Sequence, residues 1–255
     1  LPLVLFFVGI YDDAKNLNAN LKLFILGLSI YLFLILFPEF KINRLNFLSL
    51  NNEINILKIN TFFTILCLLL FINASNMTDG IDGLFLGIIL VYFSYLFLSY
   101  NFQEKFIFSI IVMVLFLLFF NYKKIFFMGD SGVFLLSSIF GLLLIKSYKS
   151  NFSSIKSIEE IFILLMIPGL DMFRLFIERI LRKNHPFKPD RNHFHHLLLK
   201  KFNDKETLLI YLLIVLIGPV LFQLKILNEA FLILLISVIF YFITYILKKF
   251  NKIKK

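Results

Sequence analysis

Five aspartates border long apolar segments of the sequence, and their positions predict a shared cation site. They are Asp12, Asp13, Asp79, Asp82 and Asp130. Carboxylates that crowd a low-dielectric boundary repel one another, and a divalent cation relieves that cost. Oxygen ligands with no cysteine nearby suit Mg²⁺ or Mn²⁺ better than zinc, and protein-bound Mg²⁺ usually also binds phosphate oxygens. Any one of these aspartates could instead cap a helix start, an alternative that five together weaken without removing.

Two pairs of glycines accompany these acids. Gly80 and Gly83 lie in DGIDG, and Gly129 and Gly132 lie in GDSG. Glycine lets backbone N–H groups approach an anion closely, and the start of a helix favours negative charge. Tight turns or close helix packing would explain the same glycines. Their pairing with aspartate at two predicted helix starts favours a phosphorylated ligand.

A basic segment contains all four histidines of the chain within residues 185–196. Its cationic and histidine residues are Arg179, Arg182, Lys183, His185, Lys188, Arg191, His193, His195 and His196. Arginine and lysine suit a diphosphate, with histidine as a donor or charge partner. Zinc is disfavoured because no cysteine lies near. The alternative is an amphipathic loop that binds lipid headgroups.

Three further charged residues lie inside or beside apolar segments. Lys22 either extends its ammonium group out of the membrane, or neutralises a phosphate and tunes Asp12 or Asp13. Asp171 and Arg174 are three residues apart on one helical face. We expect them to form a structural ion pair within their helix.

The segments that must position these residues are apolar enough to cross a membrane. Hydrophobic residues make up 60% of the 255-residue chain and charged residues 16%, which is more apolar than a soluble domain can bury. Continuous runs predict an all-α polytopic membrane protein, with one transmembrane domain over residues 1–255. About eight transmembrane helices are expected, at 21–37, 60–74, 84–100, 106–121, 133–148, 159–177, 207–222 and 229–248. LPLVLFFVGI adds a partial helix at the start, from which we expect a chain truncated at its N-terminus.

The loops between these segments alternate in charge. Counted with the nearby helix ends, one set holds 18 of the 26 Lys and Arg residues, and the positive-inside rule places it in the cytoplasm. This set comprises 11–22, 73–83, 122–132, 178–206 and the C-terminal tail. Every polar cluster described above falls in it, so we predict one composite site built from cytoplasmic loops. The net charge of +10 is therefore attributed to membrane orientation and anionic lipid, and not to nucleic acid.

Four different motifs follow one another along nearly the whole chain. They are GIYDDAKNLNANLKL, with paired aspartates and a downstream lysine, then NASNMTDGIDGL, FFMGDSG and PFKPDRNHFHHLL. Together they resemble the polyprenyl-phosphate N-acetylhexosamine-1-phosphate transferases of glycosyltransferase family 4, which include phospho-N-acetylmuramoyl-pentapeptide transferase. The last motif is more similar to the N-acetylglucosamine-1-phosphate branch than to the pentapeptide branch.

The resemblance implies a Mg²⁺-dependent phosphoglycosyl transferase, with Mn²⁺ as the alternative metal. The enzyme would transfer the sugar 1-phosphate of a UDP-N-acetylhexosamine, with GlcNAc as the default sugar, to undecaprenyl phosphate and release UMP. The lipid-linked product would serve the synthesis of O-antigen, common antigen, teichoic acid or peptidoglycan. The expected location is the bacterial inner membrane, with the site facing the cytoplasm, and a homodimer is left open.

The resemblance also implies residue roles, motif by motif. Asp130 would be the main Mg²⁺ ligand, with Asn76 or Asp79 nearby. Asp12 and Asp13 would lie by the lipid phosphate, one of them as its base, and Lys22 would hold a phosphate. Asp79 is counted with these three as catalytic. Gly80, Asp82 and Phe127 would face the uridine, and Arg191, His193, His195 and His196 would bind the diphosphate or sugar.

Two other functions fit these residues less well. A secondary transporter would place its polar residues near mid-membrane in broken helices, whereas these lie at predicted helix ends. The CDP-alcohol phosphotransferases carry D-x-x-D-G-x-x-A-R, which DGIDG does not match. A pentapeptide transferase and an inactive truncated membrane scaffold remain as alternatives. The sequence leaves open the UDP-sugar, the polysaccharide pathway, and direct attack versus a phospho-enzyme.

Overall fold

The computed structural model describes residues 1–99, 105–150, 155–184 and 190–253. The chain divides into two compact units, unit 1 (Leu1–Ile158) and unit 2 (Glu159–Lys255), and each is described by itself.

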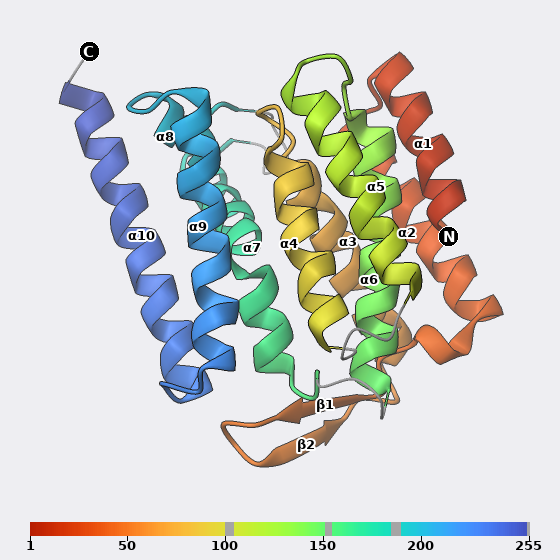
Figure 1. Cartoon of the computed structure of the whole chain (residues 1–255). Helices are drawn as coiled ribbons and strands as arrows, with labels where there is room; N and C mark the ends of the chain where they lie inside the picture. The colour runs from red at the N-terminus through yellow and green to blue at the C-terminus, as the bar shows by residue number, and fades with distance from the viewer. Residues whose placement is uncertain (100–104, 151–154, 185–189, 254–255) are drawn as a thin grey trace. The chain divides into compact units, whose positions relative to one another are not determined.

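Unit 1 contains six α-helices and a small hairpin among its described residues (Figure 1). The helices are α1 (Pro2–Lys15), α2 (Ala19–Leu36), α3 (Asn60–Asn76), α4 (Leu84–Ser99), α5 (Lys105–Tyr122) and α6 (Gly129–Lys149). A short 3₁₀ turn (Pro38–Phe40) precedes strands β1 (Arg44–Phe47) and β2 (Asn52–Asn55).

Unit 2 is entirely helical over its described residues. It consists of α7 (Ile158–Leu181), α8 (Phe194–Leu199), α9 (Asp204–Gln223) and α10 (Glu229–Ile253). Helix α9 begins with a capping box, in which Asn203 and Glu206 bond each other's backbone N–H groups. Phe194 of α8 packs against Tyr211 of α9 and Phe240 of α10, with ring centroids 5.5 and 5.1 Å apart, so α8 is fixed to the two longer helices.

All eight apolar segments expected from the sequence form helices, with ends displaced by a few residues. Five of the helices, α2, α5, α6, α9 and α10, are long and apolar enough to cross a membrane by length and composition. Helices α3 and α4 are apolar but shorter, and α7 carries charged residues and Pro168 within its length. The all-α polytopic class is confirmed, while the number of crossings and their orientation stay predictions.

Helix α6 forms the centre of unit 1. Of its most apolar stretch 61% is buried, against 17% for α2 and 22% for α5. Phe140 of α6 meets Phe71 of α3 and both Tyr92 and Phe93 of α4 at ring-centroid distances of 5.1–5.5 Å. On another side α1 approaches so closely that a Cβ on Gly9 would lie 2.3 Å from the Cα of Ser131. The first turn of α6 is therefore held rigidly against α1.

The β-hairpin is a feature that the sequence analysis did not predict. Its antiparallel strands pair Arg44 with Asn55 and Phe47 with Asn52, and Asn51 in the turn adopts a left-handed conformation with φ 46°, which asparagine tolerates. The Tyr148 hydroxyl of α6 donates to the Arg44 carbonyl at 3.1 Å. Four-residue strands with little apolar alternation leave a weak signal in sequence, which explains the omission.

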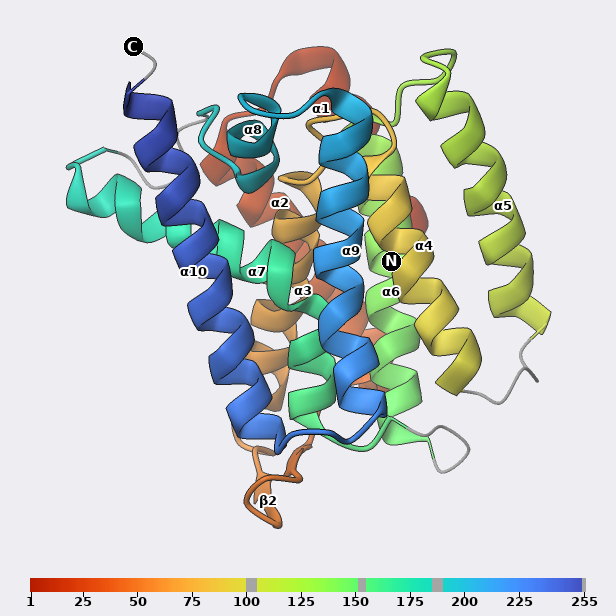
Figure 2. The ribbon, with the colours of Figure 1, turned by 60° about the vertical axis from the view of Figure 1, so that its left-hand side comes forward.

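Figures 1 and 2 show both ends of unit 1. The hairpin lies at one end, and the α3–α4 and α5–α6 connections lie at the other. The opposite end therefore gathers the loops that carry the acidic motifs.

Replacing Gly9 by alanine should destabilise unit 1, because the new Cβ would force α1 and α6 apart. Overpacking of this kind costs about 1–3 kcal/mol, so the midpoint of thermal unfolding in detergent should fall. Gly27→Ala on α2 is the matched control, since its Cβ would meet only the Leu69 Cδ1 atom at 3.4 Å and both variants gain the same helix propensity. Equal midpoints for Gly9→Ala and the unchanged protein would contradict the close packing.

Candidate functional site

The first acidic motif folds back on itself through a short turn. Asn16 adopts the left-handed conformation that ends α1, with φ 51°, and the Asn18 side chain caps α2 by accepting from the Asn20 N–H at 3.1 Å. This turn returns Lys22 to Asp12, with which it forms an ion pair. The Asp12 carboxylate is buried, 4% exposed, and also accepts the Leu17 N–H at 2.7 Å.

Lys22 also reaches the third acidic motif. Its ammonium group donates to Asp130 Oδ2 at 2.6 Å, across 108 residues of sequence. One cation thus joins Asp12 at the end of α1 to Asp130 at the start of α6. The sequence left two roles open for Lys22. The structure shows its ammonium group in contact with Asp12 and Asp130 instead of extended alone into solvent.

Asp13 caps α6 from the neighbouring helix. Its two carboxylate oxygens accept the backbone N–H groups of Asp130 at 2.8 Å and Ser131 at 3.1 Å. Gly129 makes room for this contact, because a Cβ there would lie 2.7 Å from Asp13 Oδ2 and its φ is +63°. A carboxylate at a helix start is favoured by the free N–H groups and the helix dipole. Capping, the alternative considered for each aspartate, is thus what Asp13 does, although for another helix.

Asp79 lies half-buried in the loop between α3 and α4. Burial, and after it the charges of Asp130, Asp82 and Asp13, raise its pKa to about 7. The second acidic motif therefore belongs to the same electrostatic cluster as the first and third. Its Asp79 N–H bonds the carbonyl of Asn76, the last residue of α3, at 3.2 Å.

The oxygen donors of this cluster fit a hard divalent cation by type. A cation near Asp79 and Asp130 would offset the burial and the carboxylate repulsion that together raise the pKa of Asp79. Over the described residues no three His, Cys, Asp or Glu side chains form a group that could hold a metal. Lys22 engages one oxygen of Asp130, so a cation there would share Asp130 with Lys22 or displace it.

Asn121, which the sequence analysis missed, ties two of these loops together. This buried side chain near the end of α5 accepts the Gly83 N–H at 2.5 Å and donates to the Phe126 carbonyl at 2.9 Å. Gly83 has φ 84°, a conformation that favours glycine. The signal in the sequence was a single amide in the apolar run VMVLFLLFFNY.

The residues assigned to the uridine lie at exposed positions of the same end of unit 1. Phe127 is 76% exposed, Gly80 is exposed, and the Asp82 side chain is 41% exposed and lies 3.9 Å from the Lys124 ammonium group. A large apolar side chain left this open in the α5–α6 connection can receive a planar ligand, since stacking needs one free ring face.

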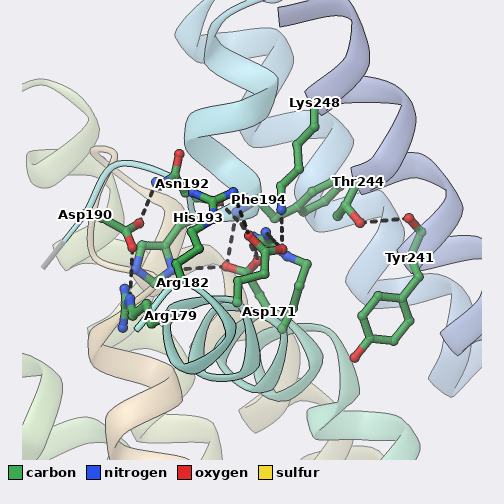
Figure 3. Close-up of polar contacts among 12 residues, drawn as sticks. Asp171, Arg179, Arg182, Asp190, Asn192, His193, Phe194, Tyr241, Thr244 and Lys248 are labelled. Atoms are coloured by element: carbon green, nitrogen blue, oxygen red, sulfur yellow. Dashed lines mark hydrogen bonds and ion pairs between the residues drawn. The ribbon is translucent and has the colours of Figure 1, made fainter. Parts of the chain in front are cut away.

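A second polar cluster lies in unit 2, around Asp171 of α7 (Figure 3). Its carboxylate accepts from Arg174 Nη2 at 2.6 Å, as expected from their spacing. It also lies 3.1 Å from His193 Nδ1 and accepts the Phe194 N–H at 3.1 Å. Arg174 continues to Glu178 at 3.0 Å, and Glu178 pairs with Lys248 of α10. The predicted ion pair between Asp171 and Arg174 thus forms, and Asp171 also contacts the histidine motif.

The three described histidines differ in exposure. His195 is 1% exposed and neither ring nitrogen has a hydrogen-bond partner, and burial together with His196 and His193 lowers its pKa to about 3. Burial likewise lowers the pKa of His196, helped by His193 and Arg191. Arg191 is exposed and His196 half-buried, so these two are the more accessible members of the set. His185 and Lys188 lie outside the described residues.

A cavity of about 180 Å³ lies beside this cluster. It is lined by Leu175, Glu178, Arg179, Arg182, Asn184, Asp190 and Asn192. Arg179 Nε donates to Asp190 at 2.8 Å. Burial alone would raise the pKa of Asp190, but the hydrogen bonds from Arg179 and the Asn192 N–H hold it below its ordinary value. Arg182 lies 4.0 Å from Glu178 and keeps 63% of its side chain exposed, so its guanidinium group is open to an anionic ligand from the solvent side.

Comparison with known proteins places this geometry in context. The family model described as glycosyl transferase family 4 matches residues 1–148. An undecaprenyl-phosphate alpha-N-acetylglucosaminyl 1-phosphate transferase of Escherichia coli K12 is 26% identical over 239 residues, covering 89% of this chain and 63% of the relative. Proteins with the same description from Thermotoga maritima and Yersinia pestis are 28% and 30% identical, over 81% and 62% of this chain. The chain spans at most 63% of the length of these relatives.

Asn121→Leu should destabilise the loop end of unit 1, because the Gly83 N–H would stay buried without an acceptor. An unsatisfied buried group of this kind costs about 1–3 kcal/mol. Ser109→Ala on the same helix is the control, since that exposed hydroxyl bonds only the carbonyl one turn back. Thermal unfolding and hydrogen exchange at Gly83 measure the effect, and unchanged protection of that amide would contradict the assignment.

Acidification should destabilise unit 2 through His195. Its folded pKa lies below its unfolded value, so the unfolded chain takes up a proton that the folded chain refuses; the stabilisation is present above about pH 6.5 and is lost as pH falls toward 3. Between pH 7 and pH 5 this amounts to about 2 kcal/mol. His195→Leu should show a correspondingly shallower fall in unfolding midpoint, and identical slopes would disprove that His195 is buried neutral.

Proposed function

Since the chain belongs to glycosyl transferase family 4, we propose that it transfers an N-acetylhexosamine 1-phosphate from a UDP-sugar to undecaprenyl phosphate. In the direct route, an oxygen of the lipid phosphate attacks the sugar-linked phosphorus of the donor, the bond to the other phosphate breaks, and UMP leaves. The product is a lipid-linked diphosphate sugar. The names of the relatives from E. coli and T. maritima support undecaprenyl phosphate as acceptor and GlcNAc as the sugar.

One observation carries the proposal: Lys22 joins Asp12 and Asp130, from motifs 108 residues apart, at one end of unit 1. The acceptor is an amphiphile whose phosphate lies at the membrane surface, and the donor is soluble and anionic. A charged cluster at helix ends is where such substrates can meet. A transporter would need polar residues near mid-helix, whereas the residues of this cluster lie at helix ends.

The two aspartates of the first motif would act differently. Asp12 is buried, so it would act by holding Lys22, which binds a phosphate oxygen. Asp13 is exposed, and its carboxylate has lone pairs left after it caps α6, so it can face the acceptor phosphate. A phosphate monoester is already mostly dianionic at neutral pH, so little base catalysis is required of either residue.

Mg²⁺ would be held by Asp130 and Asp79, with the Asn76 amide oxygen nearby. When bound, the ion would neutralise charge on the donor diphosphate as the phosphoryl group moves. The chain's own contribution is to fix Asp130 at the start of α6, through the cap from Asp13. Direct attack and a phospho-enzyme intermediate both fit this arrangement.

The exposed residues of each unit would bind the donor. Phe127, Asp82 and Gly80 would contact the uridine, and Arg191 with His193, His195 and His196 the diphosphate or sugar. Arg191 and His196 are the more accessible members of the second set, and His193 keeps 11% of its side chain exposed, so these three would make the direct contacts. The buried His195 would instead contribute to the packing of this segment.

The setting we propose is the bacterial inner membrane, with unit 1's acidic end toward the cytoplasm, on the strength of the positive charge in the adjoining loops. Cell-envelope polysaccharide synthesis would use the product. GalNAc, QuiNAc and FucNAc are alternative sugars for the same chemistry. A muramoyl-pentapeptide donor is disfavoured by the form of the last motif.

UMP release from UDP-GlcNAc should depend on undecaprenyl phosphate and disappear in Asp130→Ala. Loss of the Lys22 partner and the proposed metal ligand should lower the rate by at least about 100-fold, the scale of removing one electrostatic contact to the transition state. Asp204→Asn is the matched control, since Asp204 is an exposed aspartate at the start of α9.

Two results would contradict these expectations. Full UMP release by Asp130→Ala, with membrane insertion intact, would contradict the assignment of Asp130. Absence of release with every donor sugar in the unchanged protein would contradict the function and favour a membrane scaffold.

A further inference from the structure

Two side chains of α7 hold three consecutive residues of the histidine motif. Arg174 Nη2 donates to the Asn192 carbonyl at 2.7 Å. Asp171 lies 3.1 Å from His193 Nδ1 and accepts the Phe194 N–H at 3.1 Å. Figure 3 shows these contacts converging on α7. The segment that begins the motif is thus positioned by residues about twenty places earlier in the chain.

The contact with Asp171 specifies the chemistry of the His193 ring. An ionised carboxylate only accepts hydrogen bonds, so the proton of a neutral His193 must lie on Nδ1. Nε2 then carries the free lone pair, on the side of the ring away from Asp171. Because Asp171 and Arg174 are each 4% exposed and paired at 2.6 Å, water does not compete for this contact.

The same carboxylate also begins α8. The N-cap residue of α8 is His193, whose side chain makes no capping hydrogen bond, and Asp171 supplies the acceptor for the Phe194 N–H instead. Helix α8 carries His195 and His196, and the His193 and His195 rings lie nearly parallel, 5.6 Å between centroids and 5° between planes. The direction of His193 and the start of α8 are therefore set together.

We propose that Asp171 is a positioning residue of the transferase, which fixes His193 as its Nδ1–H tautomer and presents Nε2 as an acceptor for a hydroxyl group of the donor sugar. The inference rests on the proposed function for its ligand, but the tautomer is a property of the protein alone. Asp171 itself does not touch the substrate. It acts through His193, while Arg174 keeps its charge compensated and fixes Asn192.

Nitrogen-15 NMR of histidine-labelled protein in nanodiscs tests the tautomer without any substrate. Protonated and unprotonated ring nitrogens resonate far apart, and His193→Gln identifies the His193 signals. In spectra recorded at a pH where the His193 ring carries a single proton, we expect that proton on Nδ1, and loss of that preference in Asp171→Ala. A His193 protonated on Nε2 in the unchanged protein, or an unaltered tautomer in Asp171→Ala, would overturn the proposal.

Steady-state kinetics then test positioning. Asp171→Asn keeps the side-chain shape but weakens the contacts, so kcat/KM for the UDP-sugar should fall by about 10- to 100-fold, as for other residues that orient a functional histidine. KM for undecaprenyl phosphate should not move, because the acceptor is assigned to unit 1. Lys248→Met is the matched control, since it removes the outermost link, to Glu178, and keeps every contact of Asp171.

The outcomes separate the two proposals. Equal losses in Asp171→Asn and Lys248→Met, or equal effects on both substrates, would mean that the network is only structural. No UMP release by the unchanged protein would reject the proposed function, while the NMR result would still decide the tautomer. If Asp171→Asn and Asp171→Ala fail to fold, the tautomer in the unchanged protein remains decisive.

Discussion

A helix that begins next to a membrane leaves backbone N–H groups that need acceptors, and this constraint organises both polar clusters. In each cluster the acceptor is a carboxylate from another helix. Asp13 of α1 serves the first N–H groups of α6, and Asp171 of α7 serves the first N–H of α8. The residue of interest is the second residue of each capped helix, Asp130 in α6 and His195 in α8. Capping and positioning of the site are therefore the same interaction.

A carboxylate in such a place needs a cation, because it has lost much of its hydration. Lys22 meets this need for Asp12 and Asp130, and Arg174 meets it for Asp171. Burial, and after it the charges of three neighbouring aspartates, raise the pKa of Asp79 to about 7, and burial raises that of Asp130 to about 6 even beside Lys22. A divalent cation at these two carboxylates would offset both effects, which is a physical reason for the proposed metal site besides the motif match.

Sequence reasoning predicted the helices well and their contacts less well. Apolar runs identify α2 to α7, α9 and α10 because hydropathy is a property of local sequence. The meeting of Asp12, Lys22 and Asp130 followed from alternation of the loops, and the structure shows it in unit 1. Asn121 was missed because it hydrogen-bonds two loops that come together only in the fold. Asp171 was taken for a helical ion pair because i,i+3 spacing is visible in sequence, whereas its contacts with His193 and Phe194 are not.

The two cation–carboxylate contacts differ in how firmly they hold. Lys22 and Asp130 keep 20% and 24% of their side chains exposed, and an ammonium group is a compact charge on a flexible stem. Arg174 and Asp171 keep 4% and 6% exposed, and a guanidinium group binds several acceptors in a fixed plane. A phosphate can therefore replace Asp130 as a partner of Lys22, or a metal ion can replace Lys22 at Asp130, at little cost. Arg174, in contrast, cannot leave Asp171 without exposing a buried charge. The ion pair between Lys22 and Asp130 at the acidic end of unit 1 can therefore exchange partners, whereas the ion pair between Arg174 and Asp171 is fixed.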